Sequence, residues 1–266
     1  MKAATLFSRF FLIAGIALLL YALGLFFTIP AARLLWIWPA APALGLAFAG
    51  AWLAAGALHL LWVGVTGHLT AIRGLALGGF IAYAGTAARL ITQFALPGHE
   101  RYLLSAAIFA FGALLSGVVV ALLYRRPSAG DRDIPGPIRW VFLVFSAILL
   151  PVGVAMVLGA PHVYPVTLSP DMIVIYGCFF LGSFGYYFYG FLKPSLFNAT
   201  GHMLAFLIYD LMLIPPFVAY WPVVAPEFKT SLLVYLIILV ASAVFCAYYV
   251  LVDPMTRLFQ ARPAPS

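Results

Sequence analysis

Asp210 is the residue of this sequence whose type and position most favour chemistry. It lies near the middle of a long apolar segment, five residues before the pair Pro215-Pro216. Prolines have no backbone N–H, so carbonyls one turn earlier lose their helical partners, and we expect a kink beyond Asp210. A carboxylate beside free carbonyls is typical of a cation or proton site, and Tyr209 is its neighbour. The alternative is a hydrogen-bonded carboxyl that joins two helices.

Arg89 and Gln93 are candidate partners of Asp210. They lie one turn apart in another apolar segment that runs in the same direction. At about 1.5 Å per residue, the depths of Arg89 and Asp210 differ by about 6 Å, which an arginine side chain can span. A buried ion pair is one interpretation, and the other is that Arg89 extends to the outer headgroups. These residues and Tyr209 form the candidate site for a ligand or an ion.

His59 and His202 are candidate cofactor ligands. Both are expected in the cytoplasmic half of the membrane, where two imidazoles could hold a haem iron or one could hold a chlorophyll magnesium. Hydrogen bonds between helices are the alternative. Cys178 and Cys246 stand alone and form no zinc or disulfide pattern, so no metal site is predicted.

Aromatic residues and absent motifs complete the chemical inventory. Tyr186, Tyr187 and Tyr189 surround one helix, so some of them should meet lipid or a partner subunit. The alternative is a slot lined by their rings for a quinone, carotenoid or sterol tail. The sequence contains no serine nucleophile motif, no HExxH, no phosphate loop, no CxxC and no paired intramembrane acids. A non-catalytic protein is therefore favoured over an enzyme.

The elements that position these residues are membrane helices. Hydrophobic residues make up 65% of the chain and charged residues 8%, against about 25% charged residues in soluble domains. A bilayer core needs about 20 apolar residues per helix. Eight stretches meet that need: 10–29, 41–66, 74–96, 102–124, 139–159, 171–191, 199–222 and 230–252. The sequence thus predicts an all-α polytopic integral membrane protein in the lipid bilayer.

Basic residues orient the predicted helices. With the N-terminus inside, ten of the 14 lysines and arginines lie on the inner side, which predicts a multi-pass protein of the cell (inner) membrane with both termini cytoplasmic. The net charge of +7 reflects this topology, and no basic cluster exceeds two adjacent residues, so nucleic acid is not an expected partner. The ten are Lys2, Arg9, Arg73, Arg125, Arg126, Arg132, Arg139, Lys193, Arg257 and Arg262.

The eight helices read as a tandem duplication of a four-helix unit. Trp38-Pro39 corresponds to Tyr164-Pro165, and the segment 80–83 (FIAY) corresponds to 206–209 (FLIY), both at an offset of 126 residues. An even number of spans gives both copies the same orientation, so the pseudo-twofold axis should follow the membrane normal. The predicted division is a first repeat at 1–124, a cytoplasmic linker at 125–138, a second repeat at 139–256 and a cytoplasmic tail at 257–266.

Small residues predict where the helices touch. Glycine and other small side chains at helical spacing let backbones approach closely in a membrane. The outer connections 30–40 and 160–170 contain proline and apolar residues. We expect them to lie flat in the interface as short turns, and they could form a lid over whatever the bundle encloses. The small-residue stripes are Gly45, Ala49 and Gly56; Gly74, Gly78 and Gly85; and Cys178, Gly182 and Gly185.

Three classes of function remain open on the sequence alone, and the least favoured is a membrane enzyme. The first is a structural or accessory subunit of a membrane complex, possibly an energy-transducing one, with other membrane subunits or further copies of itself as partners. The alternative is a carrier or binder of a small hydrophobic or ionic ligand, with its site at the repeat interface near Asp210.

Overall fold

The chain folds into long helices. The structure, a computed structural model, describes residues 2–38, 41–96, 100, 102–124 and 133–258, with the backbone alone for residues 2–5. Within these ranges there is no β-strand, and eight helices are long and apolar enough to cross a membrane, which confirms the predicted all-α polytopic membrane fold. They are α1 (Lys2–Phe26), α3 (Ala43–Thr66), α4 (Arg73–Phe94), α5 (Tyr102–Leu123), α6 (Gly136–Val157), α7 (Pro170–Leu192), α8 (Leu196–Tyr220) and α9 (Lys229–Ala247).

Four short helical segments lie between or after the spans. They are α2 (Pro30–Leu34), η1 (Leu69–Ile72), η2 (Pro226–Phe228) and the π-helical η3 (Tyr248–Val252). The long helices match the predicted stretches to within a few residues, except that α1 begins well before residue 10. Residues 125–132 of the predicted linker and 259–266 of the predicted tail lie outside the described residues, and α6 already begins at Gly136.

Local signals explain where several helices begin and end. The Ser169 hydroxyl accepts a hydrogen bond from the Met172 backbone N–H, and Pro170 occupies the first helical position of α7. Ser195 caps α8 in the same way. These side chains satisfy backbone donors that have no partner inside the helix. Gly67 ends α3 with φ 71°, a conformation that glycine adopts without steric cost.

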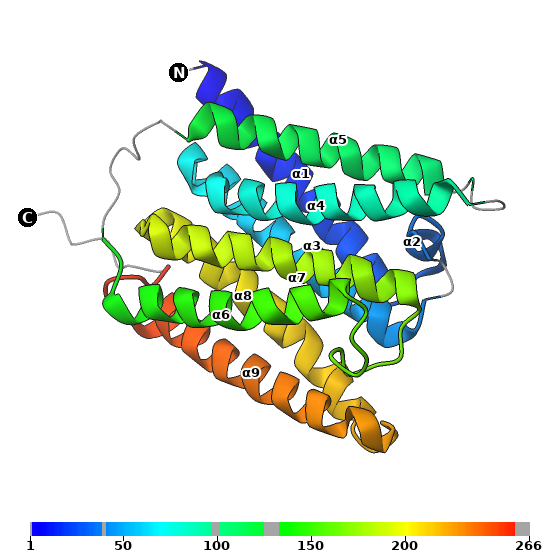
Figure 1. The fold of residues 1–266 in the computed structure, drawn as a ribbon. Helices are drawn as coiled ribbons and strands as arrows, with labels where there is room; N and C mark the ends of the chain where they lie inside the picture. The colour runs from blue at the N-terminus through cyan, green and yellow to red at the C-terminus, as the bar shows by residue number, and fades with distance from the viewer. Residues whose placement is uncertain (1, 39–40, 97–99, 101, 125–132, 259–266) are drawn as a thin grey trace, which may run out of the picture.

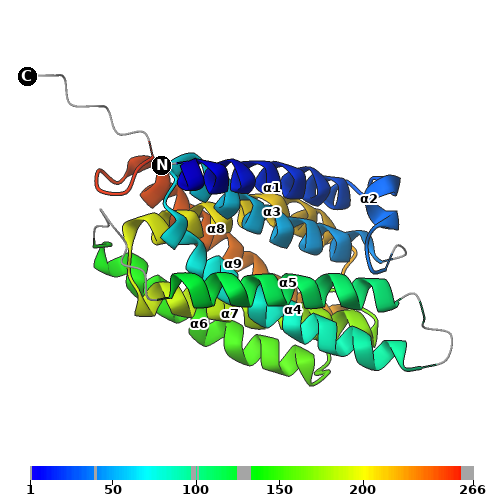
Figure 2. The same cartoon turned by 90° about the horizontal axis from the view of Figure 1, so that it is seen from above.

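The eight spans form two layers of four (Figures 1 and 2). In one layer α4 packs on α5 and α7, and α7 packs on α6. In the other, α3 packs on α1 and α8, and α8 packs on α9. The most buried spans are α3 and α7, at the centre of the bundle, and the least buried is α5, whose side chains face lipid.

The helix pairing is the same in both halves of the chain. In order along the chain, α1, α3, α4 and α5 of the first half would correspond to α6, α7, α8 and α9 of the second. The counterpart of the α4–α7 contact is then the α8–α3 contact, which is also present. Near the centre, residues 127 positions apart touch each other: Trp52 stacks on Phe179 with ring centroids 4.4 Å apart, and His59 contacts Tyr186. At the predicted offset of 126 residues these are not contacts between exact counterparts. The duplication and the superposition of the halves stay predictions.

Both outer connections are folded into the protein. Trp36, Ile37 and Trp38 of the first connection are buried, as are Tyr164 and Val166 of the second. Their side chains belong to the same apolar core as α3 and α7. These segments therefore close one end of the bundle, and the expectation that they lie flat at the membrane surface is wrong.

Candidate functional site

A cavity of about 560 Å³ lies between the two layers. All eight spans contribute side chains to its wall, and Val163 and Tyr164 of the second outer connection contribute as well. Most of the wall is apolar or aromatic, with Phe48, Trp52 and Phe180 near the centre. Hydrophobic cavities of this size with a few polar groups are typical of small-molecule sites.

Asp210 is the acidic residue on the described part of this wall. It comes from the middle of α8, is 1% exposed, and accepts a hydrogen bond of 2.5 Å at Oδ2 from the Ser242 hydroxyl of α9. Its other carboxylate oxygen, Oδ1, is buried without a hydrogen-bond partner among the described residues. An unpaired acceptor in an apolar environment costs free energy, so it marks a place where a ligand atom would be stabilised.

Tyrosines from three elements line the same cavity as Asp210. The hydroxyls of Tyr209 on α8 and Tyr235 on α9 are hydrogen-bonded to each other. Tyr164 is 4% exposed, its ring lies 6.3 Å from that of Tyr235, and its hydroxyl is buried without a partner in the described structure. Burial raises the pKa of Tyr164 well above its usual value, and the neighbouring Tyr235 and Tyr176 raise it further, so the phenol stays neutral.

The two prolines after Asp210 do not end its helix. Pro215 and Pro216 lie inside α8, which continues without interruption to Tyr220. The missing N–H groups still leave backbone carbonyls on the preceding turn without helical donors. Those carbonyls remain part of the polar environment expected near Asp210.

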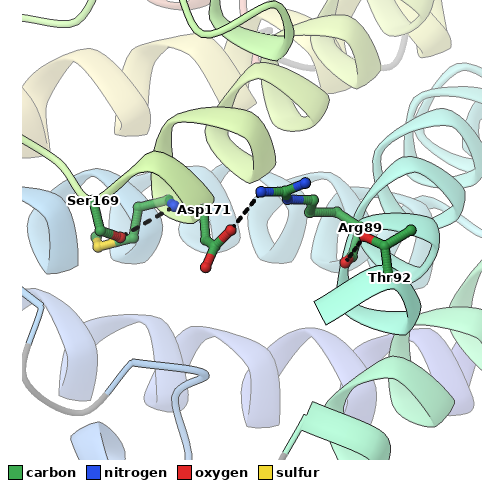
Figure 3. Close-up of polar contacts among 5 residues, drawn as sticks. Arg89, Thr92, Ser169 and Asp171 are labelled. Carbon is green, nitrogen blue, oxygen red and sulfur yellow. Dashed lines mark hydrogen bonds and ion pairs between the residues drawn. The ribbon is translucent and has the colours of Figure 1, made fainter. Parts of the chain in front are cut away.

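Arg89 pairs with Asp171, and the expected Arg89–Asp210 pair is wrong. Its Nη2 lies 2.7 Å from Asp171 Oδ1, and the two side chains are 32% and 24% exposed (Figure 3). The reason is topological: α4 and α8 belong to different layers, whereas α4 ends beside the start of α7, which carries Asp171. Gln93 lies one turn further along α4, half-buried, and is not on the cavity wall.

His59 and His202 lie together in a packed cluster outside the cavity wall. Ala71 O can only accept, so His59 donates to it from Nε2 at 2.8 Å and accepts at Nδ1 from the Tyr186 hydroxyl at 2.5 Å. The His202 ring stacks on Tyr186 with centroids 3.6 Å apart. Its nitrogens lie 2.7 Å from Asn198 O and 2.8 Å from Tyr186 O.

This packing leaves little space beside either imidazole. A Cβ atom added to Gly201 would lie 2.6 Å from His59 Cε1, and one added to Gly74 would lie 2.7 Å from His202 Cε1. A haem or chlorophyll would have to displace hydrogen bonds at the ring nitrogens and the glycine contacts. The geometry therefore favours hydrogen bonding between helices as the role of His59 and His202. No group of three or more metal-ligating side chains occurs within the described ranges.

The tyrosines of α7 divide between two environments. Tyr186 and Tyr187 are buried and reach the cavity wall, whereas Tyr189 is half-buried. Tyr187 stacks on Phe206 of α8 with ring centroids 4.1 Å apart. The inner half of the cavity is thus partly walled by tyrosine rings, which suits a flat or extended apolar ligand.

Three polar residues of the site were not singled out from the sequence. Ser242 is a small hydroxyl in an apolar run, Tyr235 lies near the outer end of a span, and Tyr164 belongs to a connection. Only Ser242 carried a usable signal, because a mid-span serine has to find an acceptor. The other two reach the cavity through tertiary packing.

Comparison of the chain with protein-family models, with curated proteins and with solved structures gives no match. Function is therefore inferred from the cavity and the side chains that line it.

Proposed function

We propose that this multi-pass membrane protein is a binder or carrier of a small lipid-soluble molecule, which it holds in the cavity between its two layers. The observation on which the proposal rests is the cavity of about 560 Å³ at the depth of the bilayer core. Ligand-binding cavities usually measure about 300–1,000 Å³ and are mostly apolar with a few polar groups. Asp210, Ser242 and the tyrosines supply those polar groups here.

The wall residues indicate a route of entry from the lipid. Phe10 of α1 and Leu115 of α5 line the cavity and are also 56% and 48% exposed. Val234 of α9 also lines the cavity and is 50% exposed. Helix α1 does not pack closely on α5, and α6 does not pack closely on α9. A ligand dissolved in the bilayer would enter sideways through these two openings.

The accessory-subunit function predicted from the sequence stays a prediction. The lipid-facing helices expose apolar side chains, but a bilayer covers such a surface as readily as a partner subunit does. A cavity that reaches the lipid on two sides has no use in a purely structural subunit. We therefore favour a binder or carrier over a scaffold.

The test uses tritiated dodecanol as the probe and protein in lipid nanodiscs, with empty nanodiscs subtracted. Gly56 lines the cavity, and a Cβ added there would have its nearest neighbours 3.9 Å away, so Gly56→Phe fills the space without a close clash at Cβ. Leu114→Phe adds a ring on the lipid-facing side of α5, where residue 114 is 65% exposed, and serves as the control.

We expect saturable dodecanol binding in the native protein and in Leu114→Phe, and a loss of at least about tenfold in affinity in Gly56→Phe, because the ring occupies the tail site. Circular dichroism and gel filtration check that each variant is folded. Absence of saturable binding, or equal binding by all three proteins, would overturn the proposal.

A further inference from the structure

We propose that the cavity selects ligands that carry an amine or ammonium group, which pairs with Asp210 and lies against a cluster of aromatic rings. This inference rests on the proposed function and specifies the ligand class of the same site. It follows from three features of the cavity wall: an unpaired carboxylate oxygen, the lack of a basic side chain among the described wall residues, and a set of aromatic faces.

The carboxylate oxygen supplies the charge partner. Asp210 Oδ1 is buried without a hydrogen-bond partner, while Oδ2 is occupied by Ser242. No lysine, arginine or histidine is among the described residues that line the cavity. Buried charges in proteins are stable when paired, so a cationic ligand group would complete a pair that the chain itself does not make.

The aromatic rings form a connected cluster on the same wall. Phe48 lies at its centre, with its ring centroid 5.2 Å from Tyr164, 5.5 Å from Phe180 and 6.1 Å from Tyr209. The ring of Tyr235 lies 6.5 Å from that of Phe180. Ring faces carry partial negative charge and attract ammonium groups, and clusters of rings recognise amines and quaternary ammonium groups in this way.

A second unpaired acceptor adds to this preference. The Tyr164 hydroxyl is buried without a partner in the described structure and lines the cavity. An ammonium group has three N–H donors, so it can bond Asp210 Oδ1 and still donate to a further oxygen of the wall. An alcohol has one donor and no charge, and a carboxylate ligand would face Asp210 with like charge.

The experiment compares three radiolabelled probes with the same tail: dodecylamine, dodecanol and dodecanoate. Each is titrated against the full-length protein in nanodiscs of neutral lipid, with empty nanodiscs subtracted. Asp210→Asn removes the charge and keeps the shape, and Glu227→Gln removes an exposed acid outside the cavity as the matched control. Tyr164→Phe removes the second acceptor and keeps the ring.

We expect dodecylamine to bind the native protein about 10- to 30-fold more tightly than dodecanol, and dodecanoate to bind most weakly. Asp210→Asn should bring dodecylamine to within about threefold of dodecanol, and circular dichroism and gel filtration check that the variant is folded. Glu227→Gln should keep the native preference, and Tyr164→Phe should reduce it only in part.

Two results would overturn the inference. Equal affinity for amine and alcohol in the native protein, with both abolished by Gly56→Phe, would leave a hydrophobic binder without a cation preference. An amine preference that persists in Asp210→Asn would place the selectivity elsewhere. If none of the probes binds, the proposed function fails together with the inference.

Discussion

Gly78 of α4 and Gly182 of α7 bring the backbones of two central helices together. A Cβ atom added to Gly78 would lie 2.6 Å from Gly182 O, and a Cβ added to Gly182 would lie 2.6 Å from Gly78 O. An ordinary contact begins near 3.4 Å, so either alanine substitution has to separate the helices locally by about 0.8 Å. The obstructing atoms belong to the backbone and cannot rotate away.

The cost of this separation can be estimated. Extra methyl groups in well-packed protein typically cost about 1–3 kcal/mol. The usual gain from replacing glycine by alanine, about 0.4–1 kcal/mol, arises largely in a flexible unfolded chain. In a membrane or micelle the unfolded spans remain helical, so little of that gain applies. We expect Gly78→Ala and Gly182→Ala each to lower the free energy of unfolding by about 1–2 kcal/mol.

The assay is unfolding by increasing SDS in mixed micelles, followed by tryptophan fluorescence and extrapolated to zero SDS. Gly56→Ala is the matched control, because a Cβ at Gly56 has its nearest neighbours at 3.9 Å and points toward the cavity. That variant should unfold like the native protein. The double variant Gly78→Ala/Gly182→Ala should cost less than the sum of the single variants, because the first methyl group already separates the helices.

The packing argument would be refuted if Gly78→Ala and Gly182→Ala unfolded at the same SDS fraction as Gly56→Ala. Strict additivity of the two single variants would also contradict it, because the two methyl groups would then act at independent contacts.

Three further predictions follow from the structure. His59→Phe leaves two buried hydrogen-bonding partners unpaired and should lower the free energy of unfolding by about 1–3 kcal/mol in the same SDS titration. An unchanged free energy of unfolding would contradict the role of His59 in joining helices. An impermeant maleimide added to intact cells should label Glu227→Cys and spare Asp133→Cys, since both positions are exposed and are predicted on opposite sides; labelling of Asp133→Cys would reverse the topology. Asp210→Leu removes a buried oxygen that has no hydrogen-bond partner among the described residues and should raise the free energy of unfolding by about 1–2 kcal/mol, whereas a loss would indicate a structural role.

The helices were predictable because membrane insertion depends on composition over about 20 residues. The contact faces were partly predictable for a similar local reason, since small residues at helical spacing let two helix backbones approach closely. Gly78 of α4 faces Gly182 of α7, and Gly85 faces Cys178, which confirms the packing expected from these two stripes. Gly56 is the exception, because it faces the cavity and makes no close helix contact.

The pairing of Arg89 was not predictable in the same way. Depth in the membrane gave Asp210 as a reachable partner, but depth says nothing about which helices are neighbours around the bundle. That order depends on the packing of α4 against α7, which brings Asp171 to Arg89. Tyr164 was not predicted as a site residue for a related reason: a residue in a connection has no periodicity that would reveal burial.

The contacts of Asp210 support the proposed binding role. A charged side chain at the centre of the bilayer costs about 2.5–3.5 kcal/mol on insertion scales, and this cost arises when α8 enters the membrane. Hydrogen bonds between helices in membranes contribute on average about 0.6 kcal/mol, and Asp210 makes one such bond, to Ser242. With Arg89 engaged by Asp171, no basic side chain of the described cavity wall pairs with Asp210. A carboxyl that keeps one oxygen without a partner on a cavity wall has the properties expected of a ligand site, because a bound cation would form the pair that the chain does not make.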